Sequence, residues 1–217
     1  ERAKKVLALY LTDFTADEIS AFVEGAYKDG KFSSEEVAPV VNLHDNVNIL
    51  ELWHGPTCAF KDMALQILPH LLIGSSKKTL KDKEIVILVA TSGDTGKAAL
   101  DGFKDVDNTR ILVFYPSDGV SPMQKLQMCT QEGKNVSVCA IEGNFDDAQS
   151  GVKKIFTDKA IAEKLAEKHK GFVPVGTNDG YFQKQGEESD KIIEKINALD
   201  VDILFVCLGV PVQEKWI

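Results

Sequence analysis

Apolar and polar positions follow one another along the chain in blocks that predict strands and helices in alternation. Three short apolar runs, rich in β-branched residues, are each followed by a polar loop and an amphipathic stretch. The runs are Ile85–Ala90, Ile111–Tyr115 and Val136–Ile141, and the stretches after them extend to about Phe103, Met128 and Phe156. This repetition predicts an α/β fold with a mostly parallel sheet and helices on both faces. In such sheets, ligands bind in the loops at the carboxyl ends of the strands.

The flanking segments carry shorter patterns. Residues 1–38 have helical spacing, and Thr15–Glu18 matches a capping box that begins a helix through about Ala26. The segment Cys58–Ile73 predicts one helix that Pro69 kinks or ends. Other predicted elements are two short strands at Val40–Leu43 and Val47–Leu52, two strands at Phe172–Val175 and Val201–Leu208, and a helix at Glu187–Leu199.

The composition of the chain argues against several classes of binding partner. The 217 residues include 25 Lys+Arg and 33 Asp+Glu, a net charge of −8, which argues against nucleic acid or an anionic membrane as a partner. No apolar run approaches the roughly 20 residues of a membrane span. The four cysteines, Cys58, Cys129, Cys139 and Cys207, are scattered, without metal-ligand spacing. We therefore expect no metal site, and free thiols in a reducing, cytoplasmic compartment.

A loop of small residues, Thr91-Ser-Gly-Asp-Thr-Gly96, joins one predicted buried strand to a helix. Gly93 and Gly96 allow a close approach to the backbone, and free N–H groups with the helix dipole favour an anion. It is not a Walker A loop, because Lys97 is followed by Ala98. From the residues alone, an anion site and a well-capped turn are equally good interpretations.

Residues His54–Asp62, HGPTCAFKD, place Lys61 in the first turn of a predicted helix among small and apolar neighbours. Desolvation and a helix N-terminus both lower the pKa of a lysine, as a Schiff-base lysine requires. The alternative is a lysine that reaches solvent beside Asp62, and the residues alone favour it.

Four motifs carry a resemblance that changes this balance. HGPTCAFKD, TSGDTG, the loop Tyr115–Gln124 and the segment Glu142–Asp147 resemble those of threonine synthases of the microbial and fungal type, over about residues 1–170. The resemblance implies a tryptophan-synthase-β-like fold (pyridoxal-phosphate fold type II), here incomplete and truncated at its N-terminus. It also implies a pyridoxal 5'-phosphate lyase of threonine biosynthesis that converts O-phosphohomoserine and water to threonine and phosphate through a Schiff base.

The same resemblance implies roles for individual residues. Lys61 would be the Schiff-base lysine and proton carrier, and Asp94 would lie near the 3′-oxygen of the cofactor. The substrate carboxylate would be held by Thr91, Ser92, Gly93, Thr95 and Gly96, and the substrate phosphate by Ser121 and Lys125. His54 is expected to pack or cap rather than act as an acid.

The end of the chain resembles another family. Residues 172–217 are similar to glycosyltransferases of the WecG/TagA type, which transfer N-acetylmannosamine from a UDP-sugar to a lipid-linked acceptor. The segments Gly176–Phe182 and Gly209–Trp216 carry this similarity, with departures at Cys207 and Val212.

We therefore predict two parts, residues 1–170 and 171–217, joined near residues 165–172. A join inside both families indicates an unnatural join (an engineered chimera), a fragment, or a partly unreliable residue assignment. Two alternatives to a threonine-synthase-like lyase stay open: a non-catalytic α/β fragment or scaffold, and a UDP-N-acetylmannosamine glycosyltransferase. The sequence does not give the oligomeric state.

Overall fold

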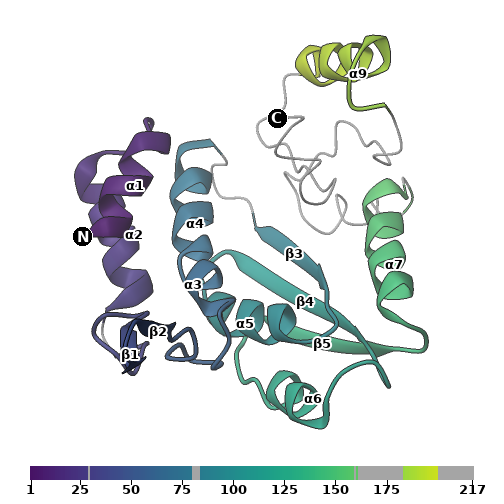
Figure 1. Ribbon diagram of the computed structural model, residues 1–217. Helices are drawn as coiled ribbons and strands as arrows, with labels where there is room; N and C mark the ends of the chain where they lie inside the picture. The colour runs from purple at the N-terminus through teal and green to yellow at the C-terminus, as the bar shows by residue number, and fades with distance from the viewer. Residues whose placement is uncertain (29, 80–83, 159, 161–182, 200–217) are drawn as a thin grey trace. The chain divides into compact units, whose positions relative to one another are not determined.

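The computed structural model describes residues 1–28, 30–79, 84–158, 160 and 183–199 (Figure 1). The chain divides into two compact units, Glu1–Ser150 and Gly151–Ile217. The division expected near residues 165–172 lies outside the described residues.

The first unit begins with a pair of helices, α1 (Arg2–Tyr10) and α2 (Ala16–Tyr27). The predicted capping box is confirmed. The Thr15 Oγ1 accepts a bond from the Glu18 N–H at 3.2 Å, and the Glu18 Oε2 accepts one from the Thr15 N–H at 2.7 Å. The buried side chains of Val23 and Ala26 on α2 pack in a small apolar cluster with Ile67.

The single helix predicted over Cys58–Ile73 is wrong in its start and its continuity. Cys58 has a φ of +58°, so helical backbone does not begin there. The structure has two helices, α3 (Asp62–Leu65) and α4 (Leu68–Thr79), and Pro69 lies at the start of the second, where its missing N–H costs nothing. Lys61 is therefore the residue that precedes α3, not a residue of its first turn.

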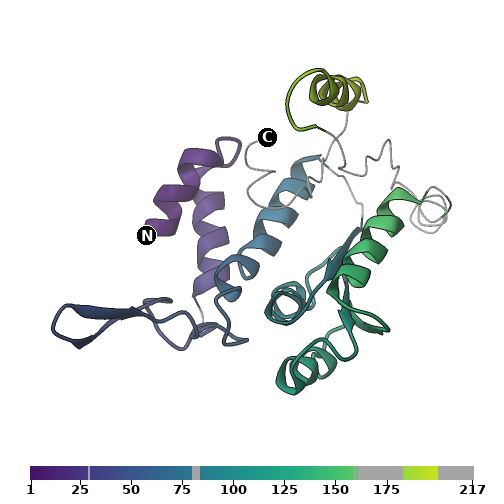
Figure 2. The ribbon, with the colours of Figure 1, turned by 45° about the vertical axis from the view of Figure 1, so that its right-hand side comes forward.

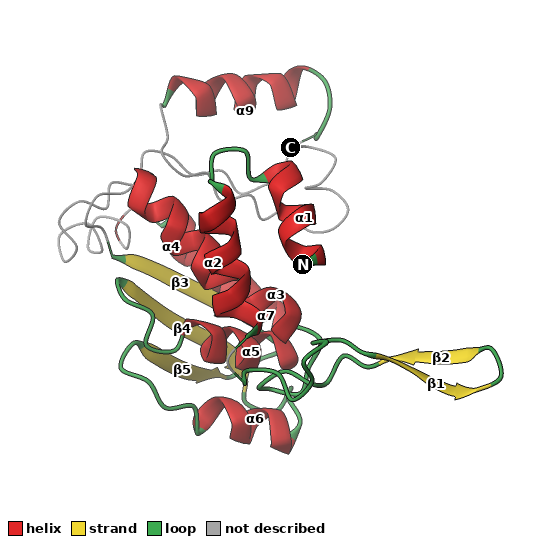
Figure 3. Cartoon of the chain, turned by 90° about the vertical axis from the view of Figure 1, so that its left-hand side faces the viewer, coloured by secondary structure: helices red, strands yellow, loops and turns green. Residues whose placement is uncertain are grey.

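A β-hairpin, β1 (Val40–His44) and β2 (Val47–Leu50), confirms the two short strands predicted here. The strands pair antiparallel, with Val41 opposite Ile49 and Asn42 opposite Asn48. Every residue of both strands is exposed, and the hairpin extends away from the other elements of the first unit (Figures 2 and 3).

The centre of the first unit is a parallel sheet in the order β3-β4-β5. Its strands are β3 (Ile85–Ala90), β4 (Thr109–Pro116) and β5 (Val136–Ile141), connected by α5 (Asp94–Phe103) and α6 (Pro122–Cys129). Ile85 pairs with Thr109, and Ile111 pairs with Val136. The predicted strand–loop–helix repeat is confirmed.

The main core lies between the sheet and the two connecting helices. Alternate residues of β4 are buried on one face, and α5 and α6 pack against that face. The cluster contains Ile111, Val113 and Tyr115 from β4, Leu100 and Phe103 from α5, and Met128 from α6. Since strand order and chain order agree, right-handed crossovers put both helices on one face.

Two further helices follow, α7 (Phe145–Thr157) and α9 (Glu187–Ala198). The helix predicted over Glu187–Leu199 matches α9 within one residue, and α7 ends one residue after the predicted Phe156. The strands predicted at residues 172–175 and 201–208, and both motifs of the C-terminal resemblance, lie outside the described residues. Among the helices that are described, none combines the length and apolarity that a membrane crossing needs.

Candidate active site

The predicted site residues come from three loops of the first unit. Thr91–Gly96 follows β3, and Ser117–Ser121 follows β4, so both loops lie at the carboxyl edge of the sheet. The third loop, Gly55–Lys61, precedes α3, which packs against α5.

Thr91 organises the turn between β3 and α5. Its buried Oγ1 accepts hydrogen bonds from the N–H groups of Gly93 and Gly96, each at 3.0 Å, and donates one to the Gly93 carbonyl at 3.1 Å. These bonds satisfy two of the amides available at the start of a helix. Ser92 is exposed and Thr95 half-buried in the same turn, so they remain more accessible to a ligand than Thr91.

The two glycines of this turn are required by close approaches. A Cβ on Gly93 would lie 2.6 Å from the Nε2 of Gln124, and one on Gly96 would lie 2.9 Å from the Cγ1 of Val113. The turn thus packs against α6 on one side and against the sheet on the other.

Asp94, the first residue of α5, is held in its ionised form. Its Oδ1 accepts a hydrogen bond from the Gln124 Nε2 at 2.8 Å and lies 3.4 Å from the Lys97 Nζ. The hydrogen bond from Gln124, followed by the positive charges of Lys97 and Lys61, holds the pKa of Asp94 below its ordinary value of 3.8. A negative charge is therefore fixed at this edge of the sheet at neutral pH.

Lys61 is half-buried, and its Nζ lies 4.7 Å from the centroid of the Phe60 ring. Its charge reaches Asp94, because it contributes to the low pKa of that carboxyl group. Within the described residues, the Lys61 Nζ makes no hydrogen bond, so this amine is available to a ligand. Asp62, its neighbour in the chain, points elsewhere.

The Asp62 carboxylate is fully buried and binds Thr57. Its Oδ1 accepts a bond from the Thr57 Oγ1 at 2.6 Å, and its Oδ2 accepts one from the Thr57 N–H at 2.9 Å. A Cβ on Gly55 would collide with the Asp62 carboxylate. Asp62, the residue after Lys61, therefore holds the loop before Lys61 in place through hydrogen bonds.

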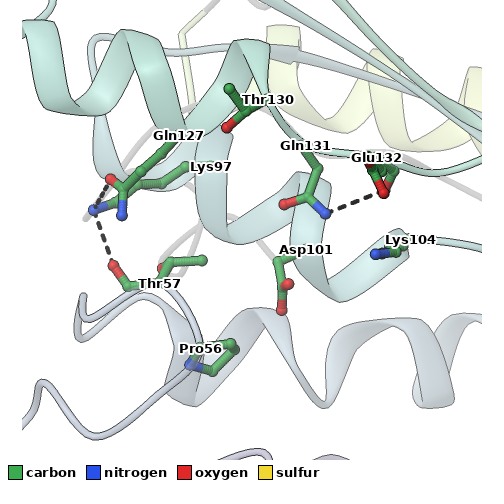
Figure 4. A pocket seen from close by; sticks show the side chains of 9 residues that line it. All are labelled: Pro56, Thr57, Lys97, Asp101, Lys104, Gln127, Thr130, Gln131 and Glu132. Atoms are coloured by element: carbon green, nitrogen blue, oxygen red, sulfur yellow. Dashed lines mark hydrogen bonds between the residues drawn. The ribbon is translucent and has the colours of Figure 1, made fainter.

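Lys97 is a residue that the sequence analysis did not assign to the site. It is buried, and its Nζ donates hydrogen bonds to the Thr57 carbonyl at 3.0 Å and to the Gln127 Oε1 at 2.9 Å (Figure 4). The only signal in the sequence was its position three residues after Asp94, which puts both on one face of a helix.

A polar cavity of about 270 Å³ lies beside Lys97 (Figure 4). It is formed by the loop before α3, one face of α5, and the end of α6 with the residues that follow. Its lining residues are Pro56, Thr57, Lys97, Asp101, Lys104, Gln127, Thr130, Gln131 and Glu132. None of the residues predicted to bind cofactor or substrate is in this set.

Ser121 and Lys125 lie at the start of α6. Ser121 caps the helix: its Oγ accepts a bond from the Gln124 N–H, and the Gln124 Oε1 accepts one from the Ser121 N–H, each at 3.2 Å. Both residues are exposed, and their roles toward a phosphate stay predictions.

His54 is hydrogen-bonded at both ring nitrogens, to the Ser33 hydroxyl at 2.8 Å and to the Glu51 carboxylate at 2.7 Å. It thus links the segments on either side of the hairpin. Across the part of the chain that is described, no three His, Cys, Asp or Glu residues come close enough to hold a metal ion.

Comparisons with known proteins give the class of fold first. The chain aligns with the solved structure of pyridoxal-phosphate-bound threonine synthase from Brucella melitensis, with a TM-score of 0.65 and 39% identity, over 76% of this chain and 36% of that one. The yeast threonine synthase structure gives a TM-score of 0.67 at 34% identity, over 73% and 33%. The fold is therefore that of pyridoxal-phosphate enzymes of fold type II.

Among curated proteins, the particular relatives are threonine synthases. The Pseudomonas aeruginosa enzyme is 43% identical over 162 residues, 74% of this chain and 34% of that protein. The Eremothecium gossypii enzyme is 38% identical over 174 residues, 75% and 34%, and human threonine synthase-like 1 is 38% identical over 165 residues, 73% and 22%. The chain thus spans about a third or less of the length of these relatives.

The model of the Glycosyl transferase WecG/TagA/CpsF family matches residues 151–217. The match begins inside α7, about twenty residues before the segment expected from the sequence motifs. The chain is therefore similar to threonine synthases over about three quarters of its length and to this second family over its C-terminal part.

Proposed function

We propose that this chain is part of a pyridoxal-phosphate enzyme of the threonine synthase type, with Lys61 as the residue that binds the cofactor covalently. The observation that carries the proposal is that the amine of Lys61, which has no hydrogen bond among the described residues, lies near enough to the ionised carboxylate of Asp94 to lower its pKa. Both belong to motifs that resemble the threonine synthases found by comparison.

The residues present fit pyridoxal phosphate in two respects. The available amine of Lys61 suits an aldehyde, and the ionised carboxylate of Asp94 suits a protonated ring substituent. When bound, the cofactor supplies an electron sink that stabilises negative charge at the α-carbon of an amino acid.

The chain's own residues would then bind and orient the substrate. Lys61 would move a proton at the α-carbon, and Asp94 would lie near the 3′-oxygen of the cofactor. The turn Thr91–Gly96 would bind the substrate carboxylate through residues Thr91, Ser92, Gly93, Thr95 and Gly96, and Ser121 with Lys125 would bind its phosphate. The substrate would be O-phosphohomoserine, with water as co-substrate and threonine and phosphate as products.

A second candidate is a non-catalytic fragment with the same fold. It is favoured by one observation: the chain covers only 33% to 36% of the solved threonine synthases. Glycosyl transfer is the least favoured alternative, since that family's model matches residues 151–217 alone. The three described cysteines, Cys58, Cys129 and Cys139, are free thiols, which supports the reducing, cytoplasmic location we propose.

The test is covalent trapping. Wild-type protein is incubated with pyridoxal phosphate, reduced with borohydride and digested, and the peptides are searched for pyridoxyl groups by mass spectrometry. We expect one dominant pyridoxyl group, on Lys61, and its loss in Lys61→Ala. A dominant group on another lysine would contradict the proposal, while turnover of O-phosphohomoserine by the purified chain would exclude the non-catalytic alternative.

A further inference from the structure

We infer that Lys97 is a positioning residue, which holds the loop bearing Lys61 in register with Asp94. The inference rests on the proposed function for its catalytic consequence. Lys97 itself lies outside the set of residues that the family resemblance assigns to cofactor or substrate.

The first step is the environment of the Lys97 ammonium group. Its side chain is only 9% exposed, and three acceptors surround the Nζ: the Thr57 carbonyl, the Gln127 Oε1 and, at 3.4 Å, the Asp94 Oδ1. An ammonium group has three donors, so all are used. A buried cation is costly unless it is paired and hydrogen-bonded, so this side chain has one favourable position.

The second step connects Lys97 to Lys61. Lys97 holds the carbonyl of Thr57, and Thr57 binds the Asp62 carboxylate through both its N–H and its hydroxyl. Asp62 follows Lys61 directly and is the first residue of α3. The backbone of Lys61 is therefore fixed to α5 through two consecutive sets of hydrogen bonds.

The third step connects Lys97 to α6. On α6, Gln127 binds Lys97, and Gln124, one turn earlier, binds Asp94. Asp94 in turn pairs with Lys97. These contacts close into a ring between the start of α5 and one face of α6, and Lys97 also binds the loop before α3.

The geometry thus assigns Lys97 a role that differs from general stabilisation. Without it, α5 and the sheet keep their core, which contains no part of this side chain. The loop Thr57–Lys61 loses its hydrogen bond to α5 and stays attached through the packing of α3 alone, so the position of Lys61 relative to Asp94 is held less tightly. A displacement of about 1 Å at a reacting group can cost up to about a hundredfold in rate.

The experiment compares three variants with the wild type. Lys97→Met keeps the length and removes the charge and all three bonds, and Gln127→Leu removes one acceptor and leaves the predicted site residues intact. Lys104→Met is the matched control, because Lys104 directly follows the same helix and lines the same cavity but makes no side-chain hydrogen bond among the described residues. Two quantities are measured: amide hydrogen exchange over Thr57–Met63, and the ratio of pyridoxyl groups on Lys61 to those on all other lysines.

We expect Lys97→Met to accelerate exchange in Thr57–Met63 by about tenfold or more, with exchange in β3 and β4 unchanged, and to lower the Lys61 ratio by about tenfold. Gln127→Leu should have a smaller effect in the same direction, and Lys104→Met none. Unchanged exchange in Thr57–Met63, or acceleration spread evenly over the sheet, would overturn the inference, as would an unchanged Lys61 ratio. If the wild type itself carries no pyridoxyl group on Lys61, the proposed function fails, and the exchange measurement alone decides whether Lys97 positions the loop.

Discussion

Asp62 shows how a single buried carboxylate can position a neighbouring functional group. It has no exposed surface, and the Thr57 hydroxyl and N–H are its hydrogen-bond donors. A hydrogen bond to a charged group contributes about 1.5–3 kcal/mol, and a buried acceptor left unpaired costs a similar amount. The order of the loop before Lys61 therefore depends on a buried side chain whose two oxygens both bind Thr57.

The first prediction concerns Thr57→Val, which keeps the shape of the side chain and removes its hydroxyl donor. We expect the free energy of unfolding, measured by urea denaturation, to fall by about 1–3 kcal/mol, because one oxygen of Asp62 loses its partner in a buried site. Thr130→Val is the control, since the Thr130 hydroxyl bonds the Leu126 carbonyl on an exposed helix face and its loss should cost less than about 0.5 kcal/mol. Equal losses of unfolding free energy in the two variants would mean that the buried hydrogen bond stabilises the fold no more than the exposed one.

Asp94 gives a prediction about pH. Its pKa in the folded protein lies below the ordinary value of 3.8, chiefly because of the hydrogen bond from Gln124. A depressed carboxyl pKa stabilises the fold fully above the unfolded pKa, and this stabilisation is lost as the pH falls through the folded pKa. The stability advantage of the wild type over Asp94→Asn should therefore be constant at neutral pH and shrink below about pH 4.

The measurement is urea denaturation of both proteins over a pH series. A stability difference that stays the same down to about pH 2 would show that the charge of Asp94 does not contribute.

Among the secondary structure elements, the contact between α3 and α5 brings the Lys61 segment to the sheet. Gly102 on α5 makes this contact possible, because a Cβ there would collide with the backbone carbonyl oxygen of Leu65 on α3. The spacing of the two helices thus depends on one missing side chain.

We therefore predict that Gly102→Ala destabilises the protein, by about 1–3 kcal/mol, although alanine is the better helix former. Gly151→Ala is the matched change on α7, where a Cβ would meet nothing within 4 Å, and it should stabilise its helix by about 0.5–1 kcal/mol. Urea denaturation followed by far-UV circular dichroism measures the free energy of unfolding of each variant against that of the wild type. A stabilising Gly102→Ala would mean that α3 moves aside at no cost.

The elements that sequence patterns predicted well are those whose residues agree locally with their structure. The apolar β-branched run Ile85–Ala90 is a strand with the predicted ends, and Thr15–Glu18 caps a helix as its pattern requires. The break between α3 and α4 was not predictable in this way, since it falls at Gln66 and Ile67, before the proline that was expected to kink or end the helix. Tertiary contacts, including the bond from Gln66 to Asp101, decide the path there.

The same distinction holds at the candidate site. Lys61 and Asp94 stand out from their motifs, whereas the role of Lys97 depends on Thr57 and Gln127, forty and thirty residues away in the chain. The position of Lys97 three residues after Asp94 is the only local signal, and an exposed helical lysine would show the same spacing. Its burial becomes evident only when the loop and α6 are both in place.

At the scale of the whole molecule, the two family resemblances give opposite expectations for ligands. A ligand that binds only the folded protein stabilises it by mass action, by about 2.7 kcal/mol at a concentration one hundred times its Kd. We predict that pyridoxal phosphate raises the Tm at which the unit Glu1–Ser150 unfolds, and that UDP-N-acetylmannosamine leaves the Tm of every unfolding transition unchanged. Differential scanning calorimetry with each ligand, and with Lys61→Ala as the control for the first, gives the answer; a Tm shift with the UDP-sugar would favour the glycosyltransferase alternative.

Amide hydrogen exchange in the exposed hairpin β1–β2 can report whether another surface covers it. A two-stranded ribbon is marginally stable in water by itself, and here Val41 and Ile49 face each other with their side chains uncovered. Its amide protons should therefore exchange quickly whenever the chain is alone and slowly whenever another surface covers it. The exchange rates of the nine residues of β1 and β2 would thus report whether another surface covers the hairpin.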